Sequence, residues 1–78
     1  MIKVRVTLPF GFTSDALDER NWLELADDAL LSDALKAVRM PVLVARTLFV
    51  CVNGALSRAN TELHDGDSVS FFPIAHGG

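Results

Sequence analysis

The last two residues, Gly77 and Gly78, present the simplest group in this sequence that could do chemistry, a terminal carboxylate. Glycine lacks Cβ, so a diglycine tail adopts conformations closed to other residues and passes through a narrow channel. It also leaves the carboxylate unhindered. A carboxylate is unreactive as it stands, because its oxygen is a poor leaving group, so chemistry at Gly78 requires an activating partner. The alternative is a frayed chain end, where small residues are common.

Other reactive residue types are sparse. Cys51 is the single cysteine, so the chain can form neither an intramolecular disulfide nor a metal site built from thiolates. His64 and His76 stand twelve residues apart without carboxylates at ligand spacing, and we predict no metal site. Asp65 and Asp67 flank a glycine, and we expect them to shape a turn rather than to transfer protons.

Length and composition limit what such a chain does alone. Its 78 residues predict one domain, residues 1–78, and half of them are apolar, including five Phe and one Trp. This is enough for one compact core and too little for a catalytic cleft with two walls. Any catalysis is therefore expected to be shared with a larger partner.

Charge and hydropathy exclude several classes of partner. The formal net charge is −3, and the two lysines and five arginines are scattered, which argues against nucleic-acid binding. The N-terminus lacks the pattern of a signal peptide, and no window of 18 apolar residues predicts a membrane span. We therefore expect a cytoplasmic protein that binds neither nucleic acid nor membrane.

The first half of the chain predicts two strands and a helix. Residues 2–8 alternate apolar and polar side chains, which is typical of a half-buried strand, and residues 22–25 form a second strand after a loop. Ser32 is the expected helix N-cap, with Asp33 in the first turn. Pro41 is expected to stop the helix at Met40. Residues 42–46 fit either a loop or a helical extension.

The second half predicts three strands joined by turns. Residues 47–53 are nearly all apolar and rich in β-branched and aromatic types, and an Asn-Gly pair follows them, as in a tight hairpin. Residues 55–58 are the expected return strand and residues 68–72 the last one. Pro73 then ends the sheet, so residues 73–78 are expected to leave it as an extended tail. The order is β-β-α-β-β-β, an α+β fold.

Three segments together resemble the MoaD/ThiS family of ubiquitin-like sulfur carriers, most closely the small subunit of molybdopterin synthase. They are M-I-K-V at 1–4, V-N-G at 52–54 and L-H-D-G-D-S-V-S-F-F-P-I-A-H-G-G at 63–78. The resemblance implies a β-grasp fold, a mixed sheet of about five strands packed on one main helix. His76 departs from the pattern, because relatives often have a small residue before the diglycine.

The resemblance also implies the chemistry of the tail. An E1-like adenylating enzyme, similar to MoeB, would use ATP and Mg to convert the Gly78 carboxylate into an acyl-adenylate. A sulfur donor of the cysteine desulfurase or rhodanese type would then produce a thiocarboxylate. The large subunit of molybdopterin synthase, similar to MoaE, would accept this sulfur. The chain itself would bind no cofactor and would act as a carrier subunit.

Strand alternation predicts which side chains are available for docking. On the last strand, Val69 and Phe71 are expected to face the helix, which places Phe72 on the opposite face. On the strand at 47–53, Leu48, Val50 and Val52 are expected to pack on the helix too, which places Phe49 and Cys51 on that opposite face. The family's partner-contacting positions match Leu56 and Phe72, and strand alternation adds Phe49. The alternatives are that a loop or a second copy of the chain covers this face, or that the strand register is shifted by one residue. The partner-binding residues that we predict are Phe49, Leu56, Phe72, Pro73, Ile74 and His76.

Three other functions stay open at this point. A thiamine-pathway carrier has the same fold and ending, although Phe-Phe-Pro before the tail favours the molybdopterin carriers. A protein modifier joined to lysines through Gly78 would use the same activated carboxylate. A β-grasp interaction module without tail chemistry would not need the two glycines.

Overall fold

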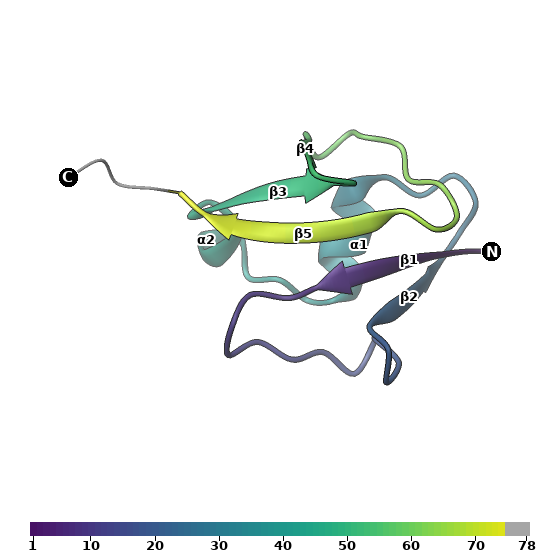
Figure 1. The fold of residues 1–78 in the computed structure, drawn as a ribbon, viewed down its shortest axis with the longest axis horizontal. Coiled ribbons are helices and arrows are strands. Elements are labelled where there is room, and N and C mark those ends of the chain that lie inside the picture. The colour runs from purple at the N-terminus through teal and green to yellow at the C-terminus, as the bar shows by residue number, and fades with distance from the viewer. Residues whose placement is uncertain (75–78) are drawn as a thin grey trace.

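A computed structural model describes residues 1–74 of the chain as one mixed sheet with two helices on one face (Figure 1). The sheet order is β2-β1-β5-β3-β4, in which β1 and β5 pair in parallel and the other neighbours are antiparallel. The elements are β1 (Ile2–Thr7), β2 (Trp22–Leu25), α1 (Leu31–Ala37), α2 (Val42–Ala45), β3 (Leu48–Val52), β4 (Ala55–Leu56) and β5 (Ser68–Pro73).

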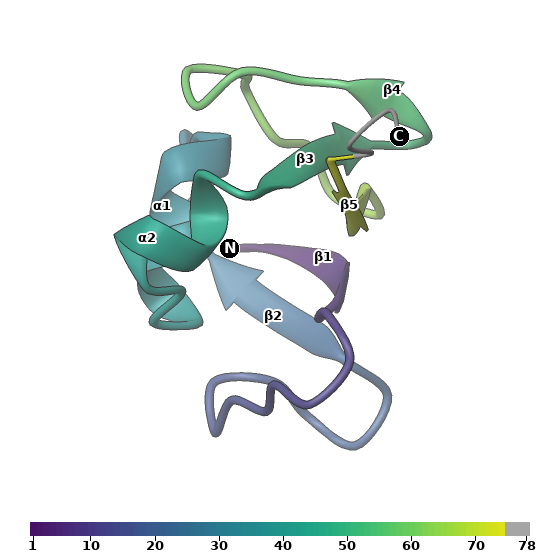
Figure 2. The same ribbon diagram turned by 90° about the vertical axis from the view of Figure 1, so that its left-hand side faces the viewer.

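The core lies between the sheet and α1. Ile2, Val4 and Val6 on β1 are buried while the residues between them are exposed, so the alternation predicted from the sequence is confirmed. Val69 on β5 and Leu31 on α1 close the same cluster. Figure 2 shows α1 and α2 on one side of the sheet, which leaves the other face uncovered in the described part of the chain.

The start of α1 differs from the prediction. The N-cap is Leu30 rather than Ser32, and the Asp33 carboxylate accepts a hydrogen bond from the Leu30 N–H at 2.8 Å. The first helical N–H groups, on Leu31 and Ser32, donate to backbone carbonyls of residues 59–61 at 2.8 and 2.9 Å. Because a distant segment satisfies these donors, the helix begins without a serine hydroxyl.

The end of α1 also differs from the prediction. The helix ends at Ala37, before Pro41 could act on it, because Arg39 adopts a left-handed conformation with φ 59°. The N–H groups of Arg39 and Met40 then bond back to the last turn, as in a Schellman motif. The segment left open in the sequence is a second short helix, α2. No helix of residues 1–74 is long and apolar enough to span a membrane.

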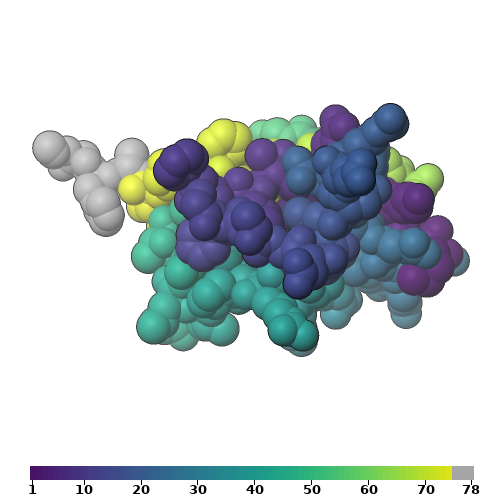
Figure 3. Space-filling model, turned by 90° about the horizontal axis from the view of Figure 1, so that it is seen from below, coloured from purple at the N-terminus to yellow at the C-terminus, as the bar shows by residue number. Residues whose placement is uncertain are grey.

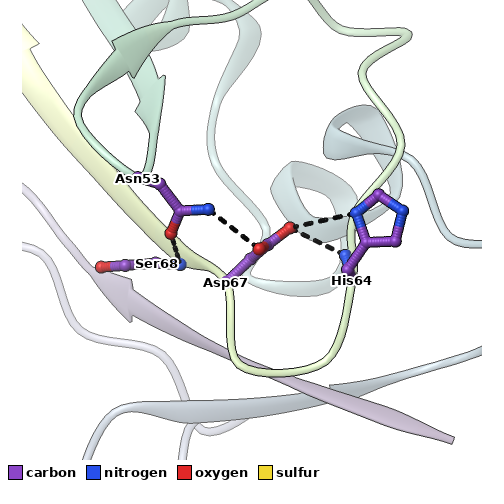
Figure 4. A network of polar contacts seen from close by, with 4 residues as sticks. All are labelled: Asn53, His64, Asp67 and Ser68. Atoms are coloured by element: carbon purple, nitrogen blue, oxygen red, sulfur yellow. Dashed lines mark hydrogen bonds and ion pairs between the residues drawn. The ribbon is translucent and has the colours of Figure 1, made fainter.

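Two turns named in the sequence fix one end of β5 (Figure 4). Asn53 has φ 53° and Gly54 has φ 82°, the left-handed pair that a tight hairpin requires. The Asp67 carboxylate accepts hydrogen bonds from the Asn53 side-chain amide at 2.9 Å and from the His64 N–H at 2.8 Å. Asn53 in turn accepts one from the Ser68 N–H at 2.9 Å. The return strand β4 is shorter than predicted, Ala55–Leu56 in place of 55–58.

Candidate functional site

The point where the chain leaves the sheet is held by β3 and α2. Pro73 is the last residue of β5 and lies opposite Leu48. The Ile74 N–H donates to the Thr47 carbonyl at 3.2 Å, and the Thr47 hydroxyl donates to the Val44 carbonyl at 2.7 Å. We call Pro73 and Ile74 the tail root. Its direction is therefore set by backbone pairing.

His76, Gly77 and Gly78 lie outside the described residues, so the roles predicted for them stay predictions. Pro73 is exposed and Ile74 is half-buried. Of the predicted tail, the structure therefore describes Pro73 and Ile74.

Large apolar side chains lie on the uncovered face of the sheet beside the tail root. Phe49 and Phe72 are direct cross-strand neighbours, 42% and 51% exposed, and Leu56 on β4 is 68% exposed. We call these three residues the apolar face. The register placing them outward is the predicted one, since Val69 is buried and Val50 and Phe71 pack against the core. Exposed aromatic pairs of this kind are a common feature of interfaces.

Cys51 lies on the same face but is covered. Its register neighbours are Leu56 on β4 and Ser70 on β5. The residue is only 9% exposed and does not belong to the core cluster on the helix side. It therefore serves as a small packing residue beneath the apolar face, the role that cysteine most often has inside a sheet.

The other half of the uncovered face is polar. Lys3 on β1 lies opposite Glu24 on β2, and Arg5 lies opposite Trp22 with its guanidinium carbon 5.2 Å from the centre of the indole ring. That distance allows a cation–π contact. The sheet thus presents two different surfaces, and only the one formed by β3, β4 and β5 is apolar.

The long loop between β1 and β2 is organised by one carboxylate. Asp18 accepts hydrogen bonds from the backbone N–H groups of Arg20 and Trp22, at 2.8 and 2.9 Å. The bond from Trp22 is the main cause that lowers the pKa of the Asp18 carboxyl below its usual value, with a smaller contribution from the Arg20 N–H. The role of Asp18 is to hold the loop.

His64 is the histidine that lies within residues 1–74. Its Nδ1 lies 3.7 Å from the Asp67 carboxylate, which is engaged in the turn of Figure 4. Within residues 1–74, no group of three potential metal-ligating side chains comes together. The two aspartates of the D-G-D turn act as turn acceptors, Asp65 for the Lys3 N–H at 2.8 Å and Asp67 as described above.

Sequence reasoning overlooked three residues at the tail-root end of the sheet. The sequence predicts Thr47 only as the first residue of a strand, whereas its carbonyl accepts the Ile74 N–H and fixes the tail root. Phe10 is fully exposed and Phe12 is 39% exposed in the loop after β1. The two phenylalanines flanking a glycine in a loop were a readable signal of an exposed aromatic turn.

Comparison with known proteins defines the class. The family model described as "ThiS family" matches residues 10–78, so the chain belongs to the ThiS family. The family consists of ubiquitin-like sulfur carriers that work with E1-like activating enzymes. The predicted β-grasp architecture is confirmed.

One solved structure illustrates the fold. The crystal structure of SAMP1 from Haloferax volcanii aligns with a TM-score of 0.63 at 21% identity, covering 99% of this chain and 98% of that chain. At this level of identity the similarity concerns the fold. A comparison with curated protein sequences gave no significant match.

Proposed function

We propose that this chain is the sulfur carrier of molybdopterin synthesis, with the carboxylate of Gly78 as its working group. The observation that carries the proposal is the position of the tail root beside the apolar face. Backbone pairing directs Pro73 and Ile74 out of the sheet next to the cross-strand pair Phe49 and Phe72. A partner that binds this face can therefore receive the diglycine in an active site that opens close to the tail root.

The proposed chemistry begins with adenylation. In the E1-like enzyme, which supplies ATP and Mg, a carboxylate oxygen of Gly78 attacks the α-phosphorus of ATP and pyrophosphate leaves. The outer sulfur of a persulfide on a cysteine desulfurase or rhodanese-type donor then displaces AMP, which gives an acyl disulfide between Gly78 and the donor cysteine. A second thiol attacks the donor-side sulfur of this disulfide, which releases the thiocarboxylate of Gly78 and leaves a disulfide between that thiol and the donor cysteine. The domain contributes no acid, base or metal ligand to these steps. Its contribution is to position the tail.

Sulfur delivery would take place in the large subunit of molybdopterin synthase. Phe49, Leu56 and Phe72 provide the apolar centre of the docking surface, because burying exposed aromatic side chains favours association. Pro73, Ile74 and His76 would line the path of the tail into that subunit. We place the complex in the cytoplasm, where the thiol of Cys51 stays reduced.

The choice between molybdopterin and thiamine synthesis is tested by discharging the carrier. The thiocarboxylated chain is mixed either with the large subunit of molybdopterin synthase and its pterin precursor or with thiazole synthase and its substrates. Intact-protein mass spectrometry follows the return from thiocarboxylate to carboxylate. We expect discharge only in the first mixture.

Two other results would redirect the proposal. Discharge only by the thiamine enzymes would assign the chain to that pathway. Higher-mass adducts in host cells that disappear when Gly78 is deleted would assign it to protein modification. A chain that gains no thiocarboxylate when the activating enzyme, ATP and a sulfur donor are all supplied would contradict the carrier role itself.

A further inference from the structure

The loop that follows β1 presents a phenylalanine on a defined turn. Phe12 N–H donates to the Pro9 carbonyl at 3.1 Å, and Gly11 has φ 89°. This hydrogen bond and the positive φ at the third position are those of a type II β-turn, with Phe10 at its second position. We call residues 9–12 the aromatic turn. Phe10 is fully exposed because this turn projects it from the surface.

The aromatic turn lies at the same end of the molecule as the tail root. β1 and β5 pair in parallel, with Thr7 opposite Ser70, so both strands leave the sheet in the same direction. Figure 1 shows the two arrowheads pointing the same way, and Figure 3 shows the dark purple atoms that follow β1 toward the same end of the molecule as the yellow end of β5. The turn begins two residues beyond Thr7.

The short tail brings any enzyme acting on it close to this end. Five residues follow Pro73, and a fully extended chain of that length spans at most about 17 Å. An enzyme that reaches Gly78 must therefore place the rim of its active site against the domain. A standard interface covers about 800 Å² per partner, whereas adjacent strands are only about 5 Å apart. A contact of that size, centred on the tail root, is wide enough to include the aromatic turn at the same end of the sheet.

We propose that the aromatic turn is a second docking element for the E1-like activating enzyme, with Phe10 entering an apolar pocket on that enzyme. The inference rests on the proposed function, because it requires Gly78 to be the substrate of adenylation. The activating enzyme is chosen as the occupant because it is the partner class that the ThiS family shares. Phe10 suits this role, since exposed aromatic side chains on defined turns lose little conformational freedom on binding.

Adenylation kinetics test the proposal. ATP–pyrophosphate exchange is measured with the full chain as the varied substrate of the activating enzyme, which gives KM and kcat for each variant. Phe10→Ser is expected to raise KM about tenfold to a hundredfold with little change in kcat, since a docking contact acts on binding. Phe10→Leu, which keeps an apolar side chain, should recover most of the affinity.

The control is Glu19→Ser, an exposed residue on the far part of the same loop. It should leave KM unchanged, and thermal unfolding should show that all variants are folded. An unchanged KM for Phe10→Ser, an equal rise for Glu19→Ser, or an effect on kcat alone would overturn the docking role.

Failure of the proposed function gives a different result. If the unsubstituted chain supports no exchange, both proposals fall; if it is a good substrate and Phe10→Ser is equally good, only the docking role falls. Sedimentation tests whether a second copy of this chain, rather than the activating enzyme, binds the aromatic turn. A dimer of the unsubstituted chain that Phe10→Ser converts to a monomer would make the turn a self-association site and would also overturn the proposal.

Discussion

The two ends of β5 are built in opposite ways. At the turn end, Asp67 and Ser68 bond to Asn53, and the Asp67 carbonyl also accepts the Arg5 N–H at 2.8 Å. At the tail end, Phe72 and Pro73 are exposed. Beyond Pro73, the described residues make a single backbone hydrogen bond, from the Ile74 N–H to the Thr47 carbonyl.

The difference separates two tasks along one strand. Side-chain hydrogen bonds to the backbone stabilise the fold at the turn end, where Asp67 is mostly covered. Exposed aromatic side chains at the tail end contribute little to folding and are available to a partner. The motif residues in the V-N-G and D-G-D segments thus have structural roles, whereas the proposed chemistry lies beyond the opposite end of the strand.

The largest expected effect comes from the tail. Deleting Gly78 should abolish thiocarboxylation, because the carboxylate that remains no longer reaches the adenylation site. The unfolding midpoint should be unchanged, since no described contact of residues 1–74 is removed. Mass spectrometry and thermal unfolding of the same sample measure both quantities. A truncated chain that is charged with sulfur as well as the full chain would contradict the assignment.

At the turn end, Asp67→Ala should lower the free energy of unfolding by about 2 kcal/mol, because it leaves the Asn53 amide and the His64 N–H without their acceptor. Urea unfolding measures this loss. Asp28→Ala, at an exposed position, is the control and should be close to neutral. Affinity for the activating enzyme, measured where the variant is fully folded, should be unchanged; weaker binding would show that the two ends are not independent.

At the tail end, Phe72→Thr should weaken binding to the molybdopterin synthase large subunit about tenfold, because it removes a central apolar contact. Thr keeps a high strand propensity, so the free energy of unfolding should fall by less than about 1 kcal/mol. Calorimetry provides the affinity, and Glu24→Thr on the polar half of the same face is the matched control. Equal affinities for both variants would reject the apolar face as a docking surface.

The smallest effect concerns the loop beside the tail end. The pKa of Asp18 is lowered in the folded chain by the Trp22 and Arg20 N–H groups, so the ionised carboxylate favours the folded loop. This contribution is complete above the unfolded pKa of about 4 and is lost as pH falls through the lower folded pKa. NMR titration should show the Trp22 amide signal moving in that acidic range, and Asp18→Asn should remove the movement. A Trp22 signal that is independent of pH would contradict this account.

Local patterns determined much of this protein. Alternation along residues 2–8 and 68–72 predicted which faces are buried, because side chains on a strand point alternately to its two sides. The Asn-Gly pair predicted a hairpin, since both residues tolerate positive φ. The same logic predicted that Phe49 and Phe72 lie outside, and the structure agrees.

Only the tertiary structure decided the features that depend on distant partners. Carbonyls of residues 59–61 moved the start of α1 away from Ser32, and the covering of Cys51 depends on neighbours from β4 and β5. The parallel pairing of β1 with β5 placed Phe10 at the same end of the molecule as the tail root. Sequence periodicity indicates which side of an element is apolar. Which element satisfies a hydrogen-bond donor or covers a side chain depends on tertiary contacts between residues that are distant in the sequence.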